Sequence, residues 1–198
     1  MAGSSSTDIV LASGSPRRRE LLMSIGLSFR VIVPQVSEAQ YACGDPVDMA
    51  RKLAQAKADA VSRLVPEAIV IAADTLVVHQ GVVLGKPRDP EHARRMLAAL
   101  SGHRHHVITG VAIAIGRDSH RLLVDHEVTV VQFRTLRSSE IEAYVASGEP
   151  ADKAGAYGIQ GLASLFVTRI EGCYFNVVGL PLAKLSVMLA VCGIDVLS

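Results

Sequence analysis

The stretch Leu11–Leu22, with the sequence LASGSPRRRELL, predicts a strand that turns sharply into a helix. A buried strand is expected over residues 9–12, because apolar residues follow a polar N-terminal segment there. The serine and glycine that come next break the strand. Ser15 followed by Pro16 is typical of a helix N-cap and a first helical residue.

Arg17 and Arg18 then occupy the second and third helical positions, where a stable helix would carry acidic residues. The unpaired backbone N–H groups and the positive end of the helix dipole already lie at this end. Helix N-termini and guanidinium groups both bind phosphate oxygens well, so the turn predicts a phosphate-binding site. A solvated basic face is the alternative interpretation.

The composition narrows the class of protein and its partners. The chain has 198 residues, 49% of them apolar, and a mean hydropathy of +0.33, yet no apolar run approaches the ~18 residues of a membrane span. A net charge of +1 gives no general attraction to nucleic acid or to acidic membranes. We therefore expect neither partner. The apolar surplus favours a large core or a subunit interface.

The ends and the cysteines suggest a cytoplasmic protein of one domain. Residues 1–8 have no pattern of a targeting peptide, so we expect a flexible tail followed by a single domain over residues 9–198. The cysteines Cys43, Cys173 and Cys192 lie far apart, which favours reduced thiols over disulfides or a zinc site.

Asp74 follows the apolar run of residues 68–73, which reads as a strand covered on both faces. A carboxylate in such a place is unfavourable unless it is paired, hydrogen-bonded or bound to a metal. Ligands usually bind at the ends of α/β strands, which favours a functional Asp74. The alternative is a structural residue held by backbone amides.

Lys57 and Lys86 are candidate cations. Asp45 and Pro46 predict the start of a helix that carries Lys57 at the border of its apolar stripe. There Lys57 either extends along the edge of the core, the more common outcome, or points inward toward a ligand. Lys86 lies between a glycine and a proline, and this constrained turn would hold its charge in a fixed place.

Gln160 lies in a glycine-rich segment, KAGAYGIQG, over Lys153–Gly161. Glycines let a backbone approach a ligand closely, and an amide side chain can both donate and accept hydrogen bonds. A surface turn is the alternative. The histidines of His103–His106 favour a solvated turn over a metal site.

Several further elements are expected from local patterns. Asp89 and Pro90 should begin a helix, and Ser139 with Glu142 should form a capping box. A hairpin is expected at residues 80–81. Strands are expected over residues 27–33, 107–115, 122–133, 165–170 and 175–178, with a turn at Arg117–Asp118 and a closing helix over 181–191.

The singled-out residues combine cations that suit phosphates with carboxylates that suit a divalent metal. The cations are Arg17, Arg18, Lys57 and Lys86, and the carboxylates are Glu38, Asp74 and Asp89. Such a set indicates phosphoryl or nucleotidyl hydrolysis.

Motifs in this order and spacing resemble the Maf family of nucleoside triphosphate pyrophosphatases. They are Leu11–Arg18 (LASGSPRR), Ala73–Thr75 (ADT), Gly85–Pro87 (GKP), Thr109–Val111 (TGV), Asp152–Gly161 (DKAGAYGIQG) and Val178–Leu182 (VGLPL). The resemblance implies an α/β fold with a mixed twisted sheet and flanking helices, of the elongated, two-lobed inosine-triphosphate-pyrophosphatase type with a central cleft. It also implies hydrolysis of a nucleoside triphosphate to the monophosphate and pyrophosphate.

The resemblance also implies roles for individual residues. Asp74 would accept a proton from the attacking water, and Glu38 would join Asp74 in holding a divalent metal, Mg²⁺ or alternatively Mn²⁺ or Co²⁺. The phosphates would be bound by Ser13, Arg17, Arg18, Lys57 and Lys86. We further expect a homodimer, from the resemblance and the apolar surplus.

Substrate choice within the family would be set by Arg17, Thr75 and Gln160, which here resemble the branch acting on dTTP and UTP. A side-chain amide can satisfy the O4 and N3–H edge of a pyrimidine. The alternatives are a 7-methyl-GTP pyrophosphatase and a nucleotide-binding regulator of cell division without turnover.

Overall fold

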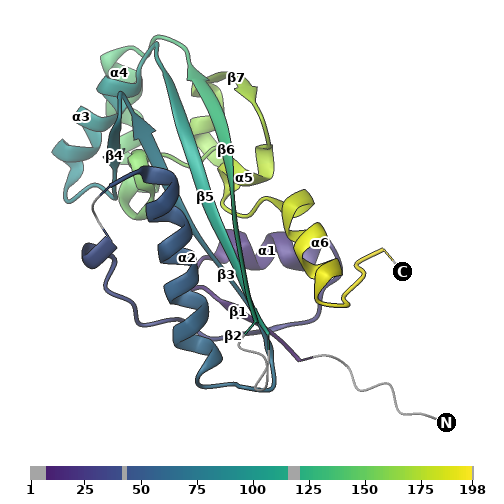
Figure 1. Cartoon of the computed structure of the whole chain (residues 1–198). Helices are drawn as coiled ribbons and strands as arrows, with labels where there is room; N and C mark the ends of the chain where they lie inside the picture. The colour runs from purple at the N-terminus through teal and green to yellow at the C-terminus, as the bar shows by residue number, and fades with distance from the viewer. Residues whose placement is uncertain (1–7, 42–43, 116–120, 198) are drawn as a thin grey trace. The chain divides into compact units, whose positions relative to one another are not determined.

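The computed structural model describes residues 8–41, 44–115 and 121–197. Within these ranges, seven strands form a sheet in the hydrogen-bonded order β2-β1-β3-β5-β6-β7, with β4 paired to β3 (Figure 1). The strands are β1 (Ile9–Ala12), β2 (Arg30–Val31), β3 (Ile69–His79), β4 (Val82–Leu84), β5 (Arg104–Ile115), β6 (Arg121–Phe133) and β7 (Val167–Glu171). Strand β1 runs parallel to β2 and β3, whereas β4 and β7 are antiparallel to their partners. The expected mixed α/β sheet is confirmed.

Six α-helices accompany this sheet in the described ranges. They are α1 (Pro16–Ser24), α2 (Pro46–Ser62), α3 (Pro90–Leu100), α4 (Ser138–Ala146), α5 (Tyr174–Val178) and α6 (Leu182–Val191). Within the part of the chain that the structure describes, no helix combines the length and the hydropathy that a membrane span needs. The expected turn at Arg117–Asp118, and the N-terminal tail apart from Asp8, lie outside the described residues.

The chain forms two compact units. The first unit comprises Met1–Asp74, Gly110–His126 and Leu182–Ser198, and the second comprises Thr75–Thr109 and Glu127–Pro181. Strands β3, β5 and β6 therefore each contribute residues to both units.

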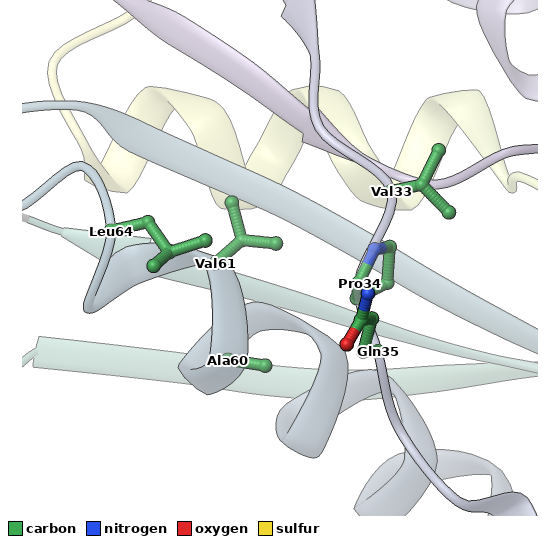
Figure 2. Close-up of a pocket in the computed structure, with 6 residues that line it drawn as sticks. All are labelled: Val33, Pro34, Gln35, Ala60, Val61 and Leu64. Atoms are coloured by element: carbon green, nitrogen blue, oxygen red, sulfur yellow. The ribbon is translucent and has the colours of Figure 1, made fainter.

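In the first unit, α2 packs on one face of the sheet through small and β-branched side chains. This core consists of Val10, Ala12, Ala54, Ala58, Val61, Ala68, Val70, Ala72, Ala112 and Ala114. Figure 2 shows α2 in front of the strands and the pale yellow α6 behind them. Because side chains alternate along a strand, Val70, Ala72 and the following Asp74 all face α2. Their alternation aims the Asp74 carboxylate at the helix.

Gly110 of β5 marks the closest approach of α2 to the sheet. A Cβ added there would lie 2.2 Å from the Ala50 carbonyl oxygen and 2.8 Å from the Arg51 nitrogen. Backbone atoms of a helix cannot move aside individually, so only glycine fits at this crossing. The glycine therefore sets the distance between α2 and the sheet.

We expect Gly110→Ala to lower the free energy of unfolding by about 1 to 3 kcal/mol or more, the usual cost of forcing an extra methyl group into a packed interior. Urea denaturation followed by circular dichroism measures this change. Gly85→Ala is the matched control, because a Cβ at Gly85 meets nothing within 4 Å. Equal stabilities of the two variants would show that α2 is not held by this contact.

In the second unit, the sequence predicted the start of α3 correctly and placed the capping box of α4 wrongly. Asp89 caps α3 as expected, accepting a hydrogen bond from the His92 backbone nitrogen at 2.6 Å. The capping box of α4 was predicted two residues too late: Glu140 accepts from the Arg137 nitrogen at 2.9 Å. Glu142 instead binds Arg94 of α3 at 2.8 Å, which joins the two neighbouring helices seen in Figure 1.

Two expected strands differ from the structure. Residues 175–178 form part of helix α5, and the buried Asn176 within it belongs to a polar network: its amide donates to the Val107 carbonyl and the Thr129 hydroxyl, both at 2.9 Å. Residues 27–33 yield only the two-residue edge strand β2. The hairpin at Gln80 and Gly81 is confirmed by the pairing of β3 with β4.

Candidate active site

Lys57 connects the two carboxylates that the sequence singled out. Its ammonium group forms a short ion pair with Asp74 and a second one, of 2.9 Å, with Glu38. The side chains of Lys57 and Asp74 are 13% and 8% exposed, against 59% for Glu38. Lys57 therefore points inward, toward a candidate ligand site, and does not extend along the edge of the core.

Asp74 lies within β3, whereas the sequence suggested the end of a strand. The strand continues through Leu76–Val78, so its backbone groups are used in the sheet. The Asp74 carboxylate is satisfied by the side chain of Lys57 from α2. The alternative of a structural aspartate held by backbone amides does not describe this arrangement.

The N-terminus of α1 adds two more members of the site. Ser15 stands at the N-cap, but its side chain makes no capping bond. The Ser13 hydroxyl accepts hydrogen bonds instead, from the Ser15 nitrogen at 3.1 Å and from the Arg18 guanidinium at 3.2 Å. Arg18 also interacts electrostatically with Asp74, Arg17 and Glu38. The basic turn and the carboxylates thus belong to one cluster.

Burial controls the ionisation of this cluster. It raises the pKa of Asp74, and the positive charges of Lys57 and Arg18 oppose the rise only in part. Burial likewise lowers the pKa of Arg18. The ionised Asp74 carboxylate is thus less stable in the folded protein than in the unfolded chain.

We expect Asp74→Asn to remove a pH-dependent part of the free energy of unfolding, because it replaces a buried acid of raised pKa by a neutral group of the same shape. An acid whose folded pKa is raised contributes stability below its unfolded pKa and loses it as the pH rises through the folded value. The wild type should therefore lose stability relative to the variant as the pH rises from below the ordinary pKa of 3.8 to neutral pH. Urea unfolding of both proteins at several pH values measures this difference, and a difference that does not change with pH would contradict the expectation.

The structure thus gathers Ser13, Arg17, Arg18, Glu38, Lys57 and Asp74 within the first unit. The remaining predicted site residues, Thr75, Lys86 and Gln160, belong to the second unit. Thr75 shares a hydrogen bond of 2.9 Å with the Thr109 hydroxyl, and the Gly179 carbonyl oxygen lies 3.5 Å from the Thr75 hydroxyl.

Lys86 and Gln160 lie on segments of the second unit that are joined to one another. Both side chains are exposed, and the Gly155 nitrogen donates to the Gly85 carbonyl at 3.0 Å. Gly155 has a φ of +67°, and a Cβ there would lie 2.9 Å from a Val77 methyl group. This glycine is therefore required by packing, and the glycine-rich segment is a folded part of the unit.

His105 and Tyr157 form a buried pair that the sequence analysis missed. The His105 Nε2 lies 2.7 Å from the Tyr157 hydroxyl, and burial lowers the pKa of His105 to about 3. The solvated turn expected for this histidine is therefore wrong. The signal was its alternation with Val107 and Thr109, which are also buried along β5.

A hollow elsewhere in the first unit is unsuited to a charged ligand. It measures about 340 Å³ and lies between residues 33–35 and the C-terminal part of α2. Figure 2 shows its lining side chains, Val33, Pro34, Gln35, Ala60, Val61 and Leu64, none of which is charged. A triphosphate would find no cation there.

The donor set of Glu38 and Asp74 fits a divalent cation such as Mg²⁺. Among the described residues, no group of three or more potential ligands is gathered for a metal. Mg²⁺ is usually bound by one or two carboxylates, with water and substrate phosphates filling the other positions. Glu38 and Asp74 both reach a single nitrogen of Lys57, so one cation can lie near both.

Comparison with known proteins identifies the family. The family model described as Maf-like protein matches residues 8–192. The chain belongs to the Maf family. A dTTP/UTP pyrophosphatase of Moorella thermoacetica is 53% identical over 188 residues, covering 95% of this chain and 96% of that protein.

A second Maf relative, the dTTP/UTP pyrophosphatase of Vibrio cholerae, is 54% identical over 175 residues, covering 88% of this chain and 92% of its own. Among solved structures, a HAM1 protein from Coxiella burnetii aligns with a TM-score of 0.47 at 16% identity, covering 93% and 99% of the two chains. The resemblance to the Maf family drawn from the sequence motifs is confirmed.

Proposed function

We propose that this protein hydrolyses nucleoside triphosphates, preferentially dTTP and UTP, to the monophosphate and pyrophosphate. The near full-length relatives bear the name of this activity. The observation that carries the proposal is the buried Asp74 carboxylate, which is held by Lys57 beside Glu38 and close to the basic N-terminus of α1. This combines a proton acceptor with cations for phosphates.

Asp74 is the proposed general base. Water attacks the α-phosphorus, a new P–O bond forms, and the bridging oxygen leaves with pyrophosphate while the proton of the water passes to the Asp74 carboxylate. A general base works best when its pKa lies near the operating pH. Burial moves the pKa of Asp74 in that direction, and Lys57 holds the carboxylate in place.

Glu38 and Asp74 would hold the divalent metal, Mg²⁺ or alternatively Mn²⁺ or Co²⁺. When bound, such an ion neutralises phosphate charge and polarises the phosphoryl group. Ser13, Arg17, Arg18, Lys57 and Lys86 would bind the phosphates, and Arg17, Thr75 and Gln160 would select the base. We also propose that residues 9–198 act as one domain, and the match of a single family model over residues 8–192 supports this. We further propose that the protein is a cytoplasmic homodimer.

The direct test is to incubate the wild type and the Asp74→Asn variant, each with Mg²⁺, with a panel of nucleotides. The panel consists of dTTP, UTP, CTP, dATP, GTP and 7-methyl-GTP. We expect pyrophosphate from dTTP and UTP with the wild type, and a loss of at least about a hundredfold in the variant, since general bases contribute ~10²- to 10⁴-fold. Chromatography of monophosphate and pyrophosphate measures both products. Urea unfolding of the variant at the pH of the assay shows whether a loss of folded protein contributes.

The same panel separates the alternatives. Turnover confined to 7-methyl-GTP would move the protein to the other substrate branch. Tight nucleotide binding without any pyrophosphate would contradict an enzyme and favour a nucleotide-binding regulator of cell division.

Arg17→Ala should reduce kcat/KM for dTTP by more than about tenfold, because a charge-assisted hydrogen bond to a phosphate is lost. Arg19→Ala is the matched control, since Arg19 is the exposed neighbour on the same helix. Steady-state kinetics on the two variants provide the comparison. Equal losses, or none in either, would count against a phosphate-binding role for Arg17.

A further inference from the structure

Gln160 lies in the middle of a short segment, residues 158–162, whose two ends are tied to one carboxylate. The Leu162 backbone nitrogen donates to Glu149 Oε2 at 3.2 Å. On the other side, the Tyr144 hydroxyl donates to Glu149 Oε1 at 3.2 Å and accepts from the Gly158 nitrogen at 3.4 Å. Glu149 thus holds the backbone after Gln160 directly and the backbone before it through Tyr144.

Apolar contacts fix which way the segment faces. Tyr157 and Ile159 are each 5% exposed and Ala163 is fully buried, whereas Gln160 is exposed. The backbone of Gln160 is extended, with φ −82° and ψ 165°. Neighbouring side chains of an extended segment point to opposite sides, so burial of Ile159 directs Gln160 outward.

Gly161 lets the Glu149 carboxylate lie directly against this backbone. Its φ is +70°, and an added Cβ would lie 2.9 Å from Glu149 Oε1 and 3.0 Å from Oε2. A side chain at this position would therefore push the carboxylate away. The segment is shaped to fit Glu149 as well as to hydrogen-bond with it.

The position of Glu149 is set independently of Gln160. Glu149 begins the 3₁₀ turn Glu149–Asp152 after Gly148, whose φ is +76°. Its backbone nitrogen donates to the Ser147 hydroxyl at 3.3 Å, and its carbonyl accepts from the Lys153 ammonium at 2.6 Å. The carboxylate therefore provides a fixed reference point for residues 158–162.

We propose that Glu149 is a positioning residue for base selection. It binds the backbone after Gln160 directly and the backbone before it through the Tyr144 hydroxyl, and thereby fixes the direction in which the Gln160 amide presents its donor and acceptor. This inference rests on the proposed function, in which Gln160 selects the base. Glu149 itself contacts protein groups and takes no part in the chemistry at phosphorus.

The test is Glu149→Ala in the full-length protein, assayed with UTP and CTP. These two bases differ at the edge where an amide would discriminate between them. We expect the ratio of kcat/KM for UTP over CTP to fall by about fivefold or more, because a hydrogen bond that fixes the position of the Gln160 amide is lost. The kcat for UTP should change by less than about twofold, because Asp74 and Lys57 are untouched.

Three further variants sharpen the comparison. Gln160→Ala should lower the same ratio, and Glu149→Gln, which keeps an acceptor oxygen for the Leu162 nitrogen, should retain most of it. Glu142→Ala removes an exposed carboxylate that binds Arg94, away from this segment, and should leave the ratio at the wild-type value. Amide hydrogen exchange in the peptide containing residues 158–163 should be faster in Glu149→Ala than in the wild type. It should stay at the wild-type rate in Glu149→Gln and in Glu142→Ala.

The outcomes distinguish the two proposals. A wild-type protein without turnover on any nucleotide contradicts the proposed function, and the inference falls with it. If the wild type prefers UTP over CTP and Glu149→Ala keeps the same ratio of kcat/KM, the inference about Glu149 is overturned while the proposed function stands. An equal loss on both nucleotides overturns it as well, since that would indicate a general structural defect.

Discussion

The ion pair between Lys57 and Asp74 places a strict condition on the first unit. An aspartate side chain is short, so α2 must lie close to β3 for the ammonium to reach it. The packing provides this closeness through Gly110, which leaves room for the Ala50 carbonyl, and through the alanines of the shared core. The small side chains of this core thus allow the approach that the ion pair between Lys57 and Asp74 requires.

The same pair explains why the cluster carries so many charges at a partly buried place. An isolated buried carboxylate would become protonated, and an isolated ammonium would lose its proton. Together with Glu38 and Arg18, the two groups limit each other's cost without removing it, since the pKa of Asp74 stays raised. The Asp74 carboxylate therefore keeps part of the cost of its burial.

Local signals in the sequence predicted much of this. Asp45 and Asp89 cap their helices, the Gln80–Gly81 hairpin forms, and the arginines take the expected helical positions. Two of the failures involve interactions between distant segments. The expected strand at residues 175–178 is a helix whose Asn176 binds β5 and β6, and neither this contact nor the Glu149 contact has a signal in its own neighbourhood.

The alternation of β3 divides two kinds of chemistry between adjacent residues. Asp74 faces α2 and its charges, while Thr75 faces the opposite side and binds the neutral hydroxyl of Thr109. Thr109 in turn donates to the Asn176 carbonyl at 3.1 Å, so this second network is anchored in buried, uncharged groups. A one-residue step along the strand therefore passes from a cluster of charged groups to a network of neutral groups. Because the period of a strand is two, a one-residue shift in the register of β3 would exchange the sides to which Asp74 and Thr75 point, so the pairing of β3 with β1 fixes which of the two faces α2.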